Sequence, residues 1–89
     1  MRGVKLVKGF NSDISHDGRQ FHIQTEDWGL KNPYLVSRVF QHGQVLKSVK
    51  LSYGDLLPKE ADINETSIRL AMSEQHHHII DLLLSDKLF

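Results

Sequence analysis

The chain has 89 residues, of which 39% are hydrophobic and 25% are charged, and these values are ordinary for one small globular domain. Its 11 basic and 11 acidic residues give a formal net charge of zero, which argues against a general nucleic-acid binder, because such proteins carry a basic excess. The absence of cysteine excludes disulfides, thiolate metal sites and cysteine nucleophiles, and it fits the reducing cytoplasm, where we expect the protein to act.

No stretch of the sequence approaches the roughly 20 apolar residues of a membrane span. The first residues also lack the apolar run of a signal peptide, so we expect no membrane association. A domain of this size buries only a small core, and such domains often gain stability from a partner or a second copy.

Residues 4 to 53 predict an antiparallel meander of four to five strands. Residues 4–8 form a short first strand or an arm entering one, and the alternation of apolar and polar residues becomes regular from residue 10. Further strands are expected at residues 20–27, 34–41 and 44–53. Asp17-Gly18 supplies the positive φ that a tight hairpin needs, and His42-Gly43 predicts another short turn. The predicted sheet core consists of Phe10, Ile14, Phe21, Ile23, Val36, Phe40, Val45, Val49 and Leu51.

The rest of the chain predicts one long helix over about residues 62–86. Asp62 is the expected N-cap, and Glu65 would complete a capping box three residues later. Steps of three or four residues give an apolar stripe with one polar interruption, made of Ile68, Met72, Gln75, Ile79 and Leu82. The predicted fold class is therefore α+β, with the meander sheet packed by the C-terminal helix in a single domain spanning residues 1–89.

Apolar side chains also lie outside that stripe near the end of the helix. Ile80, Leu83 and Leu84 are expected at its margin, because one small sheet cannot cover every face of this segment. Together with Trp28, whose place in a loop suits an interface residue, they form the predicted interaction surface. An alternative for Trp28 is that it caps the end of the core.

A second candidate site lies on the predicted strand at residues 20–27. Alternation places His22, Gln24 and Glu26 on one exposed face, next to Asp27 and Trp28. A histidine and a carboxylate there could bind a small ligand or act as general acid and base. The alternative is a polar, solvated sheet face, and the sequence offers no third catalytic member or oxyanion donor.

No metal site or cofactor is expected. Consecutive helix residues point about 100° apart, so His76, His77 and His78 cannot converge on one ion, and Glu74 with His78 would give only a weak site. A further alternative function is single-stranded nucleic-acid binding by a basic, aromatic sheet face made of Lys31, Tyr34, Arg38, Lys47, Lys50 and Tyr53.

Several segments resemble a small, largely uncharacterised family of proteins from predatory and gliding Gram-negative bacteria. The most specific is Phe21-His22-Ile23-Gln24-Thr25-Glu26-Asp27, and the others are Gly9-Phe10-Asn11, Gly29-Leu30-Lys31-Asn32-Pro33, Ser52-Tyr53-Gly54-Asp55 and Glu74-Gln75-His76. The resemblance supports the domain boundaries. It also implies a role as an accessory to a polarity or motility regulator, such as a Ras-like GTPase or a receiver protein.

The sequence therefore predicts a non-enzymatic protein–protein interaction or regulatory module, acting as a homodimer or as a small subunit of a partner protein. A ligand-binding or catalytic site around His22, Glu26, Asp27 and Trp28 is the first alternative. Nucleic-acid binding is the second.

Overall fold

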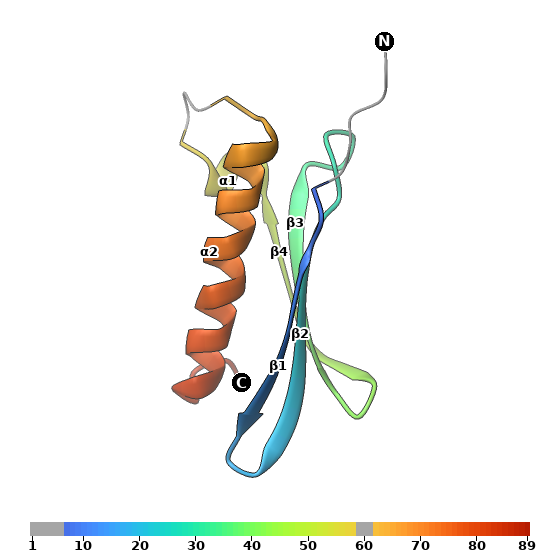
Figure 1. The fold of residues 1–89 in the computed structure, drawn as a ribbon, viewed down its shortest axis with the longest axis vertical. Helices are drawn as coiled ribbons and strands as arrows, with labels where there is room; N and C mark the ends of the chain where they lie inside the picture. The colour runs from blue at the N-terminus through green and yellow to red at the C-terminus, as the bar shows by residue number, and fades with distance from the viewer. Residues whose placement is uncertain (1–6, 59–61) are drawn as a thin grey trace.

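A computed structural model describes residues 7–58 and 62–89 of the chain. Four strands are followed by two helices, and they are β1 (Phe10–His16), β2 (Arg19–Asp27), β3 (Tyr34–Gln41), β4 (Gln44–Ser52), α1 (Tyr53–Leu56) and α2 (Glu65–Leu84). The strands form one antiparallel sheet in the order β1-β2-β3-β4, and α2 lies on one of its faces (Figure 1). This arrangement confirms the predicted α+β meander with a long C-terminal helix. The predicted start of the sheet at residues 4–6 lies outside the described residues.

Both predicted hairpin turns are present. Asp17 and Gly18 have φ of 51° and 73°, and His42 and Gly43 have φ of 53° and 77°. Two successive residues with positive φ are the signature of a type I′ turn, whose twist matches that of the strands it joins. The short turns force each strand to pair with its sequence neighbour, which produces the meander.

The helix α2 begins two residues later than the predicted N-cap implies. Its N-cap is Asn64, whose side chain accepts a hydrogen bond of 2.9 Å from the Ser67 amide, while the Ser67 hydroxyl accepts one of 3.0 Å from the Asn64 amide. The prediction of Asp62 and Glu65 as the capping box is wrong. Asparagine caps as well as aspartate does, and serine at the third position replaces the usual glutamate.

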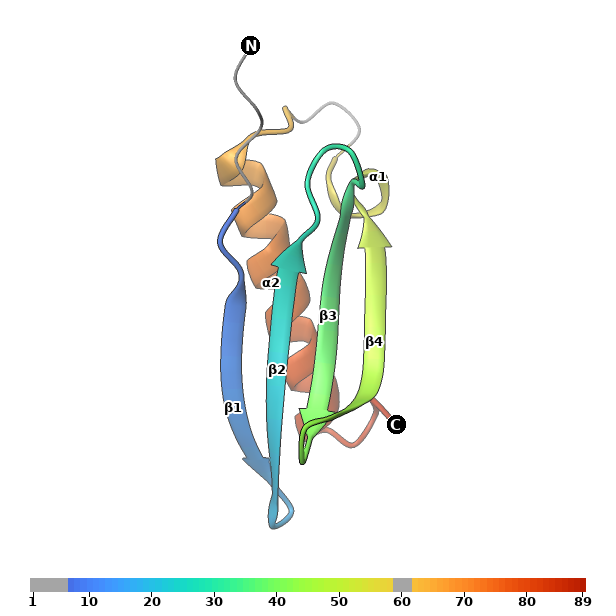
Figure 2. The ribbon, with the colours of Figure 1, turned by 90° about the vertical axis from the view of Figure 1, so that its right-hand side faces the viewer.

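The helix covers only part of the sheet. It packs on β1, β2 and β3 and crosses behind these strands, whereas β4 lies to one side of it (Figure 2). A helix with its side chains is about 10–12 Å across, and neighbouring strands are about 4.8 Å apart, so one helix covers between two and three strands. A four-stranded sheet therefore leaves one strand without helical cover. Within the described part of the chain, no helix is long and apolar enough to cross a membrane.

Two apolar clusters form between helix and sheet. One contains Val7, Leu35, Tyr53, Ile68, Ala71 and Met72. The other contains Phe21, Ile23, Val39, Ile79, Leu83 and Leu88. Buried polar side chains from β2, β3 and α2 are also present between helix and sheet: Thr25, Ser37, Gln75 and His76.

The predicted inward side of β3 is wrong. The register pairs Leu35, Ser37 and Val39 with the inward residues Asp27, Thr25 and Ile23 of β2, so these three face α2. Val36 and Phe40 consequently face the opposite side of the sheet, although Val36 is buried there as predicted, with 3% of its surface exposed. Val45 is paired with Phe40 across a bulge and is 50% exposed, so its predicted place in the core is also wrong.

Candidate functional site

The uncovered strand β4 and the helix α2 enclose a groove of about 580 Å³. On the sheet side, Val49 and Leu51 project inward from β4 and remain half-buried, and Leu56 of α1 adds to the apolar wall. On the helix side, Ile79 completes this apolar surface. The groove is therefore the part of the helix–sheet interface that α2 is too narrow to fill.

The helical rim of the groove is polar and carries two carboxylates. Glu74 and Asp81 lie on this rim, two turns apart, and His77 and His78 lie between them. Glu74, His77 and His78 fall within one turn of Gln75, Asp81 lies further along the helix, and all four side chains are exposed. A ligand in the groove would therefore meet an apolar wall on one side and negative charge along the other.

Gln75 forms the inner end of the groove. It belongs to the buried polar group, by which we mean Thr25, Ser37, Gln75 and His76. Its Nε2 donates to Ser37 Oγ at 2.9 Å, to the Leu35 carbonyl at 3.2 Å and to the Val49 carbonyl at 3.5 Å. Exchanging the amide nitrogen and oxygen would set a carbonyl against two backbone carbonyls, so these contacts fix the amide orientation. Its Oε1 is the one buried side-chain polar atom that has no hydrogen-bond partner within residues 7–58 and 62–89.

His76 continues the polar group toward the opposite edge of the sheet. Its Nε2 lies 2.8 Å from Ser12 Oγ, and its Nδ1 lies 2.8 Å from Thr25 Oγ1, which in turn lies 2.7 Å from Ser37 Oγ. Burial lowers the pKa of His76, and the neighbouring His77 and His22 lower it further. Burial therefore favours the neutral imidazole, and both of its ring nitrogens have a hydroxyl partner. The histidine run thus splits into a buried His76 and exposed His77 and His78, in agreement with their different directions on the helix.

The structure separates the residues of the predicted ligand site. His22, Gln24 and Glu26 share the sheet face turned away from α2, where His22 Nδ1 lies 2.9 Å from Asp13 Oδ1 and Glu26 forms an ion pair of 2.7 Å with Arg38. Asp27 projects from the other face and is only 6% exposed. The four side chains therefore do not converge on one point.

Asp27 instead fixes the end of the sheet. Its carboxylate accepts hydrogen bonds from the amides of Val7 at 3.1 Å and Gly29 at 2.9 Å, and from the Tyr53 hydroxyl. Burial raises the pKa of Tyr53, and the hydrogen bond to Asp27 raises it further, so the phenol stays protonated and donates. One carboxylate thus ties together the segment before β1, the β2–β3 loop and the start of α1.

Trp28 lies over the outer face of the sheet and is 37% exposed. The Lys50 ammonium lies 5.0 Å from its ring centre and 4.2 Å from that of Tyr34, and the Arg38 guanidinium lies 5.9 Å from the Trp28 ring. These cations occupy ring faces that a nucleic-acid base would need for stacking. Tyr53 is buried on the opposite side, so the predicted basic, aromatic platform does not form as one surface.

The residues predicted to form the helical interaction surface have different environments. Leu83 is only 2% exposed and packs against Phe21 and Ile23, so the prediction that it lies outside the core is wrong. Ile80 is half-buried against the same cluster, and Leu84 is 46% exposed. The β1–β2 hairpin and Leu88, which follows the end of α2, reach this part of the helix and explain the extra cover.

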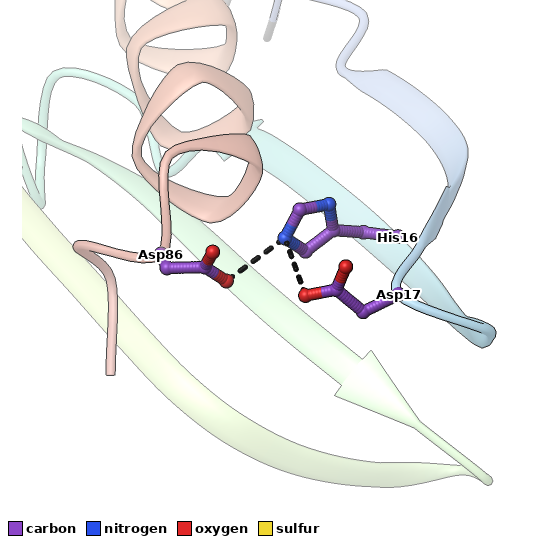
Figure 3. A group of neighbouring side chains, drawn as sticks. All are labelled: His16, Asp17 and Asp86. Atoms are coloured by element: carbon purple, nitrogen blue, oxygen red, sulfur yellow. Dashed lines mark hydrogen bonds and ion pairs between the residues drawn. The ribbon is translucent and has the colours of Figure 1, made fainter.

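A second hollow lies at the C-terminal end of α2. Here His16 Nε2 is 2.9 Å from Asp86 Oδ1 and 3.3 Å from Asp17 Oδ2 (Figure 3). The three side chains line a pocket of about 320 Å³, whose other walls are Arg19, Phe21, Leu83 and Phe89. No sequence pattern predicts this group, because Asp86 is 70 residues away from His16.

Comparison with protein-family models, with curated proteins and with solved structures finds no match for this chain.

Proposed function

We propose that this domain is a protein-interaction module that receives an extended segment of a partner protein along β4. The observation that carries the proposal is the α2–β4 groove, which runs beside an edge strand. An edge strand presents backbone amides and carbonyls that can pair with an added strand, and pockets beside it select alternate side chains of that strand.

The two edges of the sheet differ, and the difference favours β4. Beside β1, the inner face is closed by Phe10 and His76, whose rings are 5.7 Å apart, and by the Ser12–His76 hydrogen bond. Beside β4, Val49 and Leu51 stay half-buried beneath the groove. A strand added to β4 gains both backbone hydrogen bonds and apolar burial, whereas a strand added to β1 gains chiefly the hydrogen bonds.

The chemistry of the groove indicates the kind of segment that would bind. Inward side chains of the added strand would meet Val49 and Leu51, so apolar residues are expected at alternate positions. Where such a side chain extends toward the helix, it meets Glu74 and Asp81, which favours lysine or arginine. A donor that reaches Gln75 Oε1 would also satisfy the acceptor that lacks a partner in the described chain.

A second copy of the chain fits this groove less well than a different protein does. Antiparallel pairing of β4 with its own copy would place both helices on one face of a continuous sheet. Each helix would then present Glu74 and Asp81 to the shared gap, and the like charges would repel. Of the two alternatives expected from the sequence, a homodimer or a partner protein, we therefore propose the partner protein, with basic and apolar side chains in the segment that binds. A Ras-like GTPase or a receiver protein as that partner stays a prediction of the sequence resemblance.

The test is selection of short displayed peptides on the intact domain, followed by titration into the isotope-labelled protein. We expect enriched peptides to carry apolar and basic residues at alternate positions, all on the side that faces the groove, and to shift the amide resonances of β4 and of helix residues 74–81. The double variant Glu74→Lys, Asp81→Lys should lose this binding, because both rim charges are reversed. Glu65→Lys is the matched control, since this exposed glutamate lies in the first turn of α2 and does not line the groove.

Two results would overturn the proposal. One is a set of enriched peptides that binds the charge-reversed variant as tightly as the unaltered domain. The other is a set of shifted resonances confined to β1 or to the outer sheet face. Association of the unaltered domain into a dimer through β4, seen by light scattering, would identify the second copy as the occupant instead.

A further inference from the structure

The pocket at the end of α2 has the donor set of a metal site. An imidazole nitrogen and two carboxylate oxygens from His16, Asp17 and Asp86 all lie within 4.8 Å of one another. Ligand atoms around a tetrahedral zinc ion, at bond lengths of about 2.0–2.2 Å, are separated by roughly 3.3–3.6 Å. The separation of 3.3 Å between His16 Nε2 and Asp17 Oδ2 falls in that range, whereas the 2.9 Å to Asp86 Oδ1 is a hydrogen-bond length, so this oxygen would move slightly outward around an ion.

We propose that His16, Asp17 and Asp86 bind a divalent first-row metal ion of the zinc class. Both carboxylates are directed at the same nitrogen, Nε2 of His16 (Figure 3). A single N–H shared between two acceptors aligns poorly with each of them, whereas a metal ion accepts electron pairs from all three donors together. The imidazole favours zinc, cobalt or nickel over magnesium and calcium, which prefer an all-oxygen shell.

The three ligands come from two separate segments of the chain, the end of β1 with its following turn and the residues after α2. Asp17 occupies the first central position of the β1–β2 turn, with φ of 51°. Asp86 follows the last turn of α2 with φ of 57°, and it is held there by amide hydrogen bonds from Asp86 to the Leu83 carbonyl and from Lys87 to the Leu82 carbonyl. This is a Schellman ending, in which glycine is the usual residue at the position of Asp86.

The pocket also provides room for the rest of a coordination shell. Three protein ligands leave the fourth tetrahedral position for water or for a small ligand, as in zinc sites that are not purely structural. The hollow of about 320 Å³ opens beside the three donors, and Arg19 on its wall favours an anion, such as a carboxylate, in that position. A bound ion would also join the first hairpin of the chain to its C-terminal residues.

The test uses zinc chloride and cobalt chloride on the full chain purified without a metal-affinity column. We expect one zinc ion per chain by calorimetry, and a tetrahedral cobalt absorption band. Zinc at about five times its dissociation constant should raise Tm by about 4–8 °C, the shift expected for a domain of this size.

The variants Asp17→Asn and Asp86→Asn remove one charge each and keep residues that tolerate positive φ, so the turn and the helix ending are preserved. Both should lose the zinc-dependent rise in Tm, with an unchanged circular dichroism spectrum. Asp13→Asn is the matched control, because the Asp13 carboxylate pairs with His22 at 2.9 Å on the outer face, away from the pocket.

The proposal and the sequence-based expectation of no metal site predict opposite results. Failure to bind zinc at a one-to-one ratio would overturn the proposal. It would equally be overturned if binding survived in both pocket variants, or if it were lost in His78→Ala and kept in His16→Ala, since the ion would then be held by α2. The groove proposed to bind a peptide lies between α2 and β4, whereas the proposed metal pocket lies beside the β1–β2 hairpin. The peptide proposal and the metal proposal can therefore fail independently.

Discussion

At the scale of single residues, Thr25 is important because its buried hydroxyl forms hydrogen bonds with both Ser37 and His76. Thr25→Val keeps the size of the side chain but leaves these two groups without their partner. We expect a loss of about 1–3 kcal/mol in the free energy of unfolding, measured by urea denaturation. Thr66→Val, the same change at an exposed position of α2, should have little effect. Equal or greater stability of Thr25→Val would show that the hydroxyl is dispensable.

His76 makes the stability of the domain depend on pH. Burial lowers its pKa in the folded state, whereas the unfolded chain binds a proton at the ordinary histidine pKa of about 6.5. Below that value the unfolded state holds more protons, so the free energy of unfolding contributed by this group decreases as pH falls through the folded-state pKa. We expect His76→Gln to flatten this acid-side decrease in a series of urea titrations. His77→Ala, which alters an exposed neighbour, should keep most of it; an equally steep decrease in His76→Gln would assign the effect to other groups.

The candidate ligand site on β2 was only partly predictable from the sequence. Strict alternation placed His22, Gln24 and Glu26 on one face, and the register agrees. The same rule places Asp27 on the core side, where an isolated carboxylate is costly. Its hydrogen-bond partners, the Val7 amide and the Tyr53 hydroxyl, come from distant segments of the chain. No local sequence pattern therefore predicts that the buried carboxylate has hydrogen-bond donors.

At the scale of elements, the start of α2 depends on Asn64 and not on Asp62. Asn64→Ala removes the acceptor for the Ser67 amide, and loss of such a cap costs about 0.5–2 kcal/mol. Asp62→Ala should cost much less, because Asp62 contributes only its backbone carbonyl, which accepts from the Ser67 hydroxyl. Thermal denaturation of both variants by circular dichroism checks this. A larger loss in Asp62→Ala would restore the capping box predicted from the sequence.

Alternation of apolar and polar residues does not predict which face of β3 packs against α2. Residues 34–41 carry apolar side chains at both parities, with Leu35 and Val39 on one face and Val36 and Phe40 on the other. The polar Ser37 made the first face look like the solvent side, yet Ser37 is 1% exposed and belongs to the buried polar group. Turns and helix stripe were predictable because they are local, whereas the side of β3 depends on hydrogen bonds to α2 across the core.

At the scale of the whole molecule, the chain has two apolar clusters connected by the same strands and by α2, which runs through both. Ile68 belongs to one cluster and Ile79 to the other, and both are at least 95% buried. The two residues are eleven positions apart, or about 16 Å along the helix axis. Their side chains are therefore too far apart to contact each other. The question is whether the clusters unfold together.

Paired substitutions answer this question, because Ile68→Val and Ile79→Val remove the same methyl group from each cluster. Each should cost about 0.5–1.5 kcal/mol, and the double variant should lose the sum within about 0.5 kcal/mol. Trp28 reports on the sheet end that Asp27 fixes, while far-ultraviolet circular dichroism reports on α2. If the clusters form one cooperative unit, both signals shift by the same amount in each variant. A shift of the helix signal alone in Ile79→Val would mean that the buried polar group separates two independently unfolding halves.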